Sequence, residues 1–139
     1  MPAKLESATP RAKKKLGGLI ASCRGKNMSQ RQLALAVGLP PSNMKYIEDG
    51  INCPTPDVYT RLISELNPSR EKRAKLDRAY MDARNIPPPD VCDKVKKDQR
   101  LMDIIRSIDS PLTESQSRQI VALLGTFSAE TANGDQSNG

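Results

Sequence analysis

Residues 28–54 read MSQRQLALAVGLPPSNMKYIEDGINCP, and this pattern predicts two short helices joined by a tight turn. Ser29 is a good N-cap, and Gln32 three residues later completes a capping box. Gly38 ends the first helix, because a residue without a Cβ adopts the left-handed conformation at the lowest cost. Between these two signals, Leu33, Ala34 and Val37 repeat at i, i+1 and i+4 and form one apolar helical face.

The second helix of this segment begins at Pro41 and ends before Gly50. Met44 and Ile47, three residues apart, lie on the same side of it. Two helices this short cannot bury a core alone, so we expect them to form part of a small helical bundle. A helix–turn–helix that delivers its second helix to the DNA major groove is the use that this arrangement favours.

The composition favours an all-α protein. The 139 residues include one Phe, three Tyr and no Trp, so the core must consist of Leu, Ile, Val, Met and Ala. This length suits one domain, or a small domain with an appendage.

Charge is distributed unevenly along the chain. Residues 1–50 carry nine Lys or Arg and three Asp or Glu, a net charge of +6. Residues 51–100 carry a net +3, and residues 101–139 a net −3. A basic front part suits a domain that binds a polyanion, whereas the alternative is a scatter of solubilising lysines.

Several function classes are disfavoured by what the sequence lacks. No apolar run approaches the roughly 18 residues of a membrane span, and no secretory signal is visible at the start. Three cysteines without C-x-x-C spacing indicate reduced thiols in the cytoplasm. The chain has no histidine, which removes Cys–His and Ser–His catalysis and most zinc sites. We therefore expect no enzymatic activity, no metal and no cofactor.

Turn and breaker residues divide the chain into five parts. Residues 1–8 are predicted to form a flexible arm, and residues 9–86 a helical domain containing the helix–turn–helix. Three prolines at 87–89 predict a stiff linker. Residues 90–128 are predicted to form a helical hairpin, and residues 129–139 a disordered tail.

Five helices are predicted in the helical domain, at residues 10–26, 30–37, 41–49, 56–66 and 68–84. Thr9 as N-cap and Pro10 at the first helical position open the first of them. Gly17 and Gly18 each weaken this helix by about 1 kcal/mol relative to Ala. Close packing at that point would explain why they are tolerated.

The hairpin is predicted from two amphipathic segments, residues 91–108 and a helix capped by Thr113 with Gln116. An exposed apolar stripe normally requires a partner. We expect self-association, and the alternative is that the hairpin packs back on residues 9–86. The expected dimerisation residues are Leu101, Ile104, Ile105, Ile108, Ile120, Val121, Leu124 and Phe127.

With its flanks included, the segment at residues 16–66 resembles the lambda-repressor-like (Cro/C1-type, XRE) helix–turn–helix family. The matching residues are Leu16, Gly17, Ile20, Arg24, Ser29, Gln30, Leu33, Ala34, Gly38, Leu39, Met44, Ile47, Glu48, Gly50 and Pro54. The resemblance implies a five-helix DNA-binding domain followed here by the helical hairpin. It also implies that residues 41–49 form the recognition helix. The base-contacting residues would be Pro41, Ser42, Asn43, Lys45 and Tyr46.

The resemblance also assigns roles outside the recognition helix. Arg24 and Glu48 match the pair that forms an internal salt bridge between the first helix and the recognition helix. The residues expected to contact DNA phosphates are Ser29, Gln30, Lys13, Lys14 and Lys15. The chain departs from the family at Pro40, which replaces a capping Ser or Thr, and at Pro41, where a long polar side chain often reads a base.

The sequence therefore predicts a cytoplasmic, dimeric regulator of transcription that binds an inverted-repeat operator in double-stranded DNA. A repressor from a bacterium, phage or mobile element is the leading interpretation. One alternative is an antitoxin that neutralises a toxin and autoregulates its operon, and another is a protein-interaction adaptor. The chain is too short to include a self-cleaving peptidase domain, so release from DNA would involve a protein anti-repressor, proteolysis or dissociation.

Overall fold

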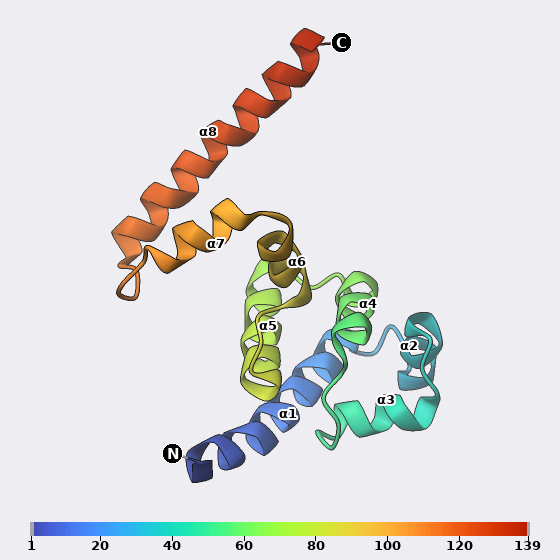
Figure 1. The fold of residues 1–139 in the computed structure, drawn as a ribbon. Helices are drawn as coiled ribbons and strands as arrows, with labels where there is room; N and C mark the ends of the chain where they lie inside the picture. Colours follow the sequence, from blue (N-terminus) through green and yellow to red (C-terminus); the bar gives the residue numbers. More distant parts are fainter. Residues whose placement is uncertain (1, 139) are drawn as a thin grey trace. The chain divides into compact units, whose positions relative to one another are not determined.

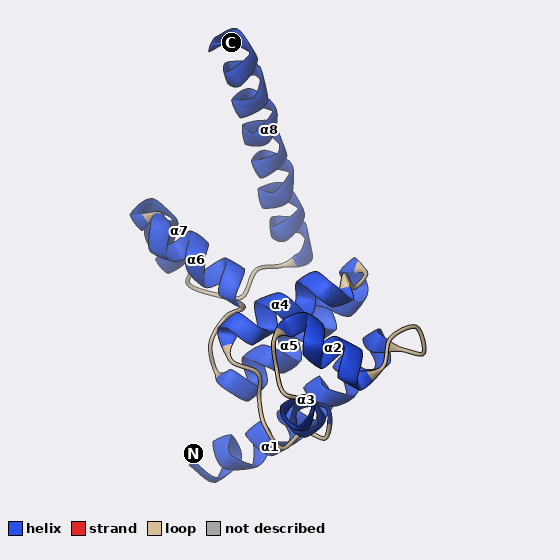
Figure 2. Ribbon diagram, turned by 90° about the vertical axis from the view of Figure 1, so that its right-hand side faces the viewer, coloured by secondary structure: helices blue, strands red, loops and turns tan. Residues whose placement is uncertain are grey.

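The computed structural model describes the backbone of residues 2–138 and the side chains of residues 10–127. Within this range every regular element is an α-helix, which confirms the all-α class (Figures 1 and 2). The elements are α1 (Pro2–Arg24), α2 (Gln30–Val37), α3 (Pro41–Glu48), α4 (Pro56–Leu66), α5 (Arg70–Arg84), α6 (Pro89–Lys97), α7 (Gln99–Arg106) and α8 (Glu114–Asn138). The chain divides into two units, residues 1–97 and residues 98–139.

The helices of the first unit enclose one apolar core. α1 packs along α5 and also contacts α2 and α3, whereas α4 contacts α2 and α6 (Figure 1). The apolar stripes predicted for the two short helices are part of this core, and Met44 and Val37 are completely buried. The core residues are Leu16, Ile20, Leu33, Ala34, Val37, Met44, Ile47, Tyr59, Leu62, Leu76, Ala79 and Tyr80.

The turn signals predicted for α2 are present in the structure. The Ser29 hydroxyl accepts a hydrogen bond from the backbone N–H of Gln32 at 3.0 Å, and the Gln32 side chain accepts one from the backbone N–H of Ser29 at 2.7 Å. Gly38 adopts a φ of 75° and closes the carboxyl end of α2. Pro40 gives α3 no side-chain cap. A turn of three residues thus separates α2 from α3.

α1 and α3 cross so closely that no side chain fits between them at Gly17. A Cβ on this residue would lie 2.4 Å from the Ile47 carbonyl oxygen and 2.5 Å from that of Glu48. Gly50, just after α3, also lies close to α1, since a Cβ on Gly50 would lie 2.5 Å from the Lys14 Cα. A Cβ on Gly18, by contrast, would have no neighbour within 4 Å among the described atoms. Close packing therefore explains Gly17 and does not explain Gly18.

Two stacked tyrosines join α4 to α5 in the core. The rings of Tyr59 and Tyr80 lie 4.2 Å apart between centroids. The Tyr59 hydroxyl donates a 2.7 Å hydrogen bond to Asp77, whereas the buried Tyr80 hydroxyl has no hydrogen-bond partner in the described part of the chain. Burial and the Asp77 hydrogen bond raise the pKa of Tyr59, so this hydroxyl keeps its proton at neutral pH.

The boundary between the units differs from the predicted one at residues 87–89. Pro88 is buried and Pro89 begins α6, which contacts α4. An ion pair of 3.4 Å between Arg73 and Asp90 also links α6 to α5. The proline segment is therefore packed within the first unit, and Pro89 begins α6 because the N–H that proline lacks would be unpaired at the first helical position.

The predicted helix over residues 91–108 is two helices, because Asp98 is extended (φ −137°, ψ 102°) and caps α7. The second unit thus contains α7 and α8, and their packing against each other as a hairpin stays a prediction. The structure also continues α1 through residues 2–8 and α8 through residues 129–138, where an arm and a disordered tail were predicted. Residues 2–8 include several good helix formers, such as Ala3, Leu5 and Glu6. Met1 and Gly139 lie outside the described residues.

The second unit presents a mostly exposed apolar surface. The start of α8 has the predicted capping box, in which the Thr113 N–H donates to Gln116 at 2.9 Å and the Gln116 N–H donates to Thr113 at 3.1 Å. The exposed hydrophobic residues of this unit are Ile104, Ile105, Ile108, Leu112, Ile120, Val121, Leu123, Leu124 and Phe127. Leu101 is half-buried.

The α1–α3 crossing predicts opposite effects for two adjacent glycines. We expect Gly17→Ala to destabilise the first unit by about 2 kcal/mol, because the added Cβ forces the two helices apart. Gly18→Ala should stabilise it by about 0.5–1 kcal/mol, since alanine is the better helix former and the space is open. Urea midpoints at unchanged m-value measure both effects. An equal gain in stability from the two substitutions would contradict the close crossing.

Candidate nucleic-acid interface

α3 presents one apolar face inward and one polar face outward. Met44 is completely buried and Ile47 is 6% exposed. Ser42, Lys45 and Tyr46 lie on the opposite side and are exposed, with 45% of Tyr46 accessible. These three side chains therefore form the outward face of α3. They are the part of the predicted base-contacting set that the helix brings together.

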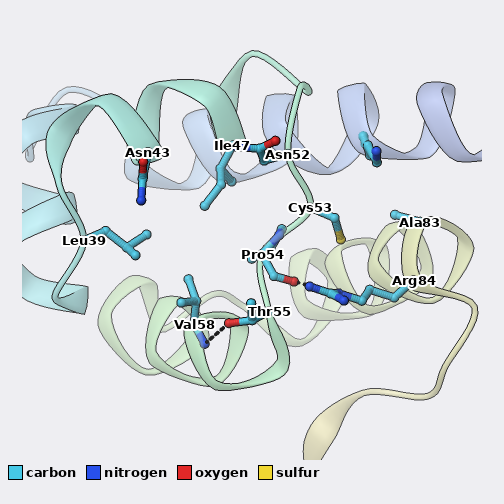
Figure 3. Close-up of a pocket in the computed structure, with 11 residues that line it drawn as sticks. Leu39, Asn43, Ile47, Asn52, Cys53, Pro54, Thr55, Val58, Ala83 and Arg84 are labelled. Atoms are coloured by element: carbon cyan, nitrogen blue, oxygen red, sulfur yellow. Dashed lines mark hydrogen bonds between the residues drawn. The ribbon is translucent and has the colours of Figure 1, made fainter.

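Asn43 is also exposed, but it lies to one side of this outward face. It lies one turn before Ile47, on the flank of the buried stripe. Figure 3 shows its side chain pointing into a pocket beside Leu39 and Val58. Pro41 is exposed at the first position of α3. The i,i+4 spacing to Ile47 was the signal that could have set Asn43 apart from the outward residues, whereas the pocket beside it depends on where α4 packs.

Lys45 is paired with a carboxylate that the sequence interpretation missed. Its ammonium group lies 2.6 Å from Asp49, in an i,i+4 pair whose two side chains are both exposed. The hydrogen bond to Asp49 raises the pKa of Lys45. Asp49 is the C-cap residue of α3, so a negative charge lies at the edge of the outward face. The i,i+4 spacing was the signal that could have identified this pair.

A network of hydrogen bonds holds the opposite side of α3. The Arg24 guanidinium donates two hydrogen bonds of 2.9 Å to the Glu48 carboxylate, so the predicted salt bridge is present. Arg24 also donates to the Met28 carbonyl oxygen at 3.0 Å. The Gln30 amide donates to Glu48 at 3.1 Å. Because the Glu48 side chain is only 5% exposed, this network joins α1, the start of α2 and the end of α3 away from most solvent.

Two of the five predicted phosphate-contacting residues, Ser29 and Gln30, are hydrogen-bonded within the described structure. The Gln30 amide bonds Glu48, and the Ser29 hydroxyl caps α2. Lys13 is half-buried and lines the pocket beside α3, whereas Lys14 and Lys15 are exposed on α1. Gln30 therefore has a structural partner that its sequence position alone did not reveal.

No family model, no curated protein and no solved structure matches this chain. Among the described residues, no helix is long and apolar enough to cross a membrane. No group of three or more His, Cys, Asp or Glu side chains is placed to hold a metal ion in the described part. The geometry of the first unit is thus the basis for any proposal about function.

The Arg24–Glu48 pair makes a testable contribution to stability. Arg24→Met should destabilise the protein by about 3 kcal/mol, because it leaves the nearly buried Glu48 carboxylate with Gln30 as its remaining partner. Gln30→Ala should cost about 1 kcal/mol, the value of one lost hydrogen bond. Arg31→Met, at an exposed position of α2, is the matched control and should change stability by less than about 0.5 kcal/mol. Equal urea midpoints for Arg24→Met and Arg31→Met would contradict this role.

Proposed function

We propose that the protein is a double-stranded DNA-binding regulator of transcription with a lambda-repressor-like helix–turn–helix, acting in the cytoplasm as a dimeric repressor. α3 is the recognition helix in this proposal. Ser42, Lys45 and Tyr46 face the bases, and Lys14 and Lys15 on α1 face the phosphates.

The observation that carries the proposal is the two-sided character of α3. Its inward side is fixed by Met44, Ile47 and the Glu48 network, while its outward side consists of exposed polar and aromatic groups. A helix that enters the major groove needs a rigid mount and donors or acceptors that reach base edges. The Ser42 hydroxyl, the Lys45 ammonium group and the Tyr46 phenol are donors or acceptors that can reach base edges. The net charge of +6 over residues 1–50 supports binding to a polyanion.

The exposed apolar surface of α7 and α8 supports dimerisation. Patches of this kind on a small unit mark interaction sites. Dimers of helix–turn–helix proteins bind two half-sites about one helical turn apart. An antitoxin would use the same surface to bind a toxin, and an adaptor would use it without DNA. Recovery of a stable protein partner, with no DNA selected, would favour these alternatives.

Selection from a random double-stranded DNA library tests the function directly. The full chain is incubated with the library at about 0.15 M salt, and the retained duplexes are sequenced. Enrichment of an inverted repeat with half-sites one turn apart is the expected result. Retention without any sequence enrichment would contradict sequence-specific regulation.

The Lys45–Asp49 pair gives a sharper test of α3. On the selected duplex, Lys45→Ala should weaken binding by about 1–3 kcal/mol. Asp49→Asn should tighten binding severalfold and steepen the salt dependence, because it removes a negative charge beside the duplex and releases the ammonium group. Lys75→Ala, an exposed cation on α5, is the control. Fluorescence anisotropy at several salt concentrations gives the DNA affinities and their salt dependence. Equal DNA affinities for the three variants would exclude α3 as the recognition helix.

Dimerisation is tested by charge substitutions at two of the most exposed apolar residues of the second unit. Ile104 and Val121 are each 60% exposed, so an aspartate there is compatible with the fold of one chain. Ile104→Asp and Val121→Asp should each convert a dimer to a monomer at micromolar concentration in sedimentation equilibrium. Leu35→Asp, at a 78% exposed leucine of the first unit, should leave the dimer intact. A monomeric parent protein would contradict the proposed dimer.

A further inference from the structure

A pocket of 540 Å³ lies behind the recognition helix, within the first unit (Figure 3). Its walls come from α1, α3, the loop after α3, α4 and α5. Small-molecule sites commonly have volumes of about 300–1,000 Å³ and combine an apolar lining with a few polar groups. The size of this pocket therefore suits a small organic molecule.

The two ends of the pocket differ in chemistry. Leu39, Ile47 and Val58 line one end, which we call the apolar end, and the Asn43 amide is the polar group that points into it. Lys13 and Arg84 line the other end, where both interact electrostatically with the Cys53 thiol. Figure 3 shows Cys53 and Arg84 on the side away from Leu39. The pocket is thus apolar at one end and cationic at the other.

The cationic end has no counter-charge among the described residues. No carboxylate lines the pocket, and neither Lys13 nor Arg84 forms an ion pair in the part of the chain that the structure describes. Arg84 donates its Nε–H to the Pro54 carbonyl oxygen at 3.0 Å and its side chain also hydrogen-bonds the Cys53 thiol, and further N–H donors of the guanidinium remain for a ligand. Burial raises the pKa of the Cys53 thiol in spite of the two cations. The thiol therefore stays neutral and does not balance their charge.

A buried polar group that does not line the pocket interacts with residues at its cationic end. The Tyr80 hydroxyl is buried without a hydrogen-bond partner in the described part, and it interacts electrostatically with Arg84 and Cys53. Buried polar groups are normally satisfied by protein, water or a ligand. Lys13 and Arg84, which line this end without a carboxylate partner in the described part, indicate a site for an anionic group.

We propose that this pocket binds a small organic carboxylate with an apolar body. Lys13 and Arg84 hold the carboxylate, and Leu39, Ile47 and Val58 contact the apolar body. Arginine recognises carboxylates through paired hydrogen bonds, and the partly buried setting strengthens them. Inorganic phosphate alone would leave the apolar end unfilled, so it should bind much more weakly.

The position of the pocket couples the ligand to α3. Ile47 and Asn43 of α3 line it, and Ile47 also contributes its carbonyl oxygen to the close contact with Gly17. A ligand packed against these residues changes how α3, the proposed recognition helix, packs on the rest of the first unit. Regulation of DNA affinity by the ligand rests on the proposed function, whereas binding of the ligand does not.

The experiment measures binding of 2-naphthoate to the full chain by isothermal titration calorimetry without DNA. We expect a dissociation constant below about 1 mM, and affinity about tenfold or more above that of the isosteric, neutral 2-naphthamide. Inorganic phosphate tests the contribution of the apolar end. Lys13→Gln and Arg84→Gln should each weaken 2-naphthoate binding about fivefold or more.

Matched controls come from the same helices. Lys15→Gln on α1 and Arg78→Gln on α5 are exposed and do not line the pocket, so they should keep the parent affinity. Three results would overturn the proposal: equal affinity for naphthoate and naphthamide, no naphthoate binding at about 1 mM, or an equal loss of naphthoate affinity in the pocket variants and the control variants. Tight binding of inorganic phosphate, at the level of naphthoate, would also overturn it.

The DNA readout is separate. Anisotropy on the selected duplex, with and without 2-naphthoate, should show a change in affinity that Lys13→Gln abolishes. Calorimetric binding by a protein that selects no duplex would support the pocket and reject the proposed function, so the two failures are distinguishable.

Discussion

α1 and α3 meet where Gly17 faces the carbonyl oxygens of Ile47 and Glu48, and no side chain could be placed between the two helices at this point. The contact continues at Gly50, which lies against the backbone of Lys14. Close approach of two backbones requires glycine, since any Cβ would collide with main-chain atoms that cannot move independently. The orientation of α3 in the first unit depends on this contact.

The charged network acts at the same place. Glu48, at the end of α3, accepts hydrogen bonds from Arg24 on α1 and Gln30 at the start of α2. A nearly buried carboxylate is stable only when its lone pairs are satisfied, so the network restricts the three helix ends to one arrangement. We regard its value as geometric: it specifies the angle at which the outward face of α3 is presented, more than it adds to the free energy of folding.

α3 consequently has two functional sides in our proposals. The outward side contains Ser42, Lys45 and Tyr46, with Asp49 reducing the local positive charge. The flank that contains Asn43 lines a pocket with an apolar end and a cationic end. A helix that contacts DNA on one side and a small ligand on another can transmit occupancy of the pocket without a separate regulatory domain.

The sequence by itself determined the local features of this protein. Ser29, Gln32 and Gly38 act through hydrogen bonds and backbone conformations within a few residues, and the stripe that includes Met44 and Ile47 follows the helical period. The resemblance to known helix–turn–helix domains also indicated the partnership of Arg24 with Glu48. Only the tertiary structure decided that Gly17 is at a helix crossing and Gly18 is not, that the proline segment is packed, that Asp98 divides a predicted helix, and that Asn43 turns toward a pocket. The glycine crossing, the proline packing and the pocket beside Asn43 depend on contacts between residues far apart in the chain, which local periodicity and propensity do not encode, whereas the Asp98 cap is a local hydrogen bond to the Arg100 N–H.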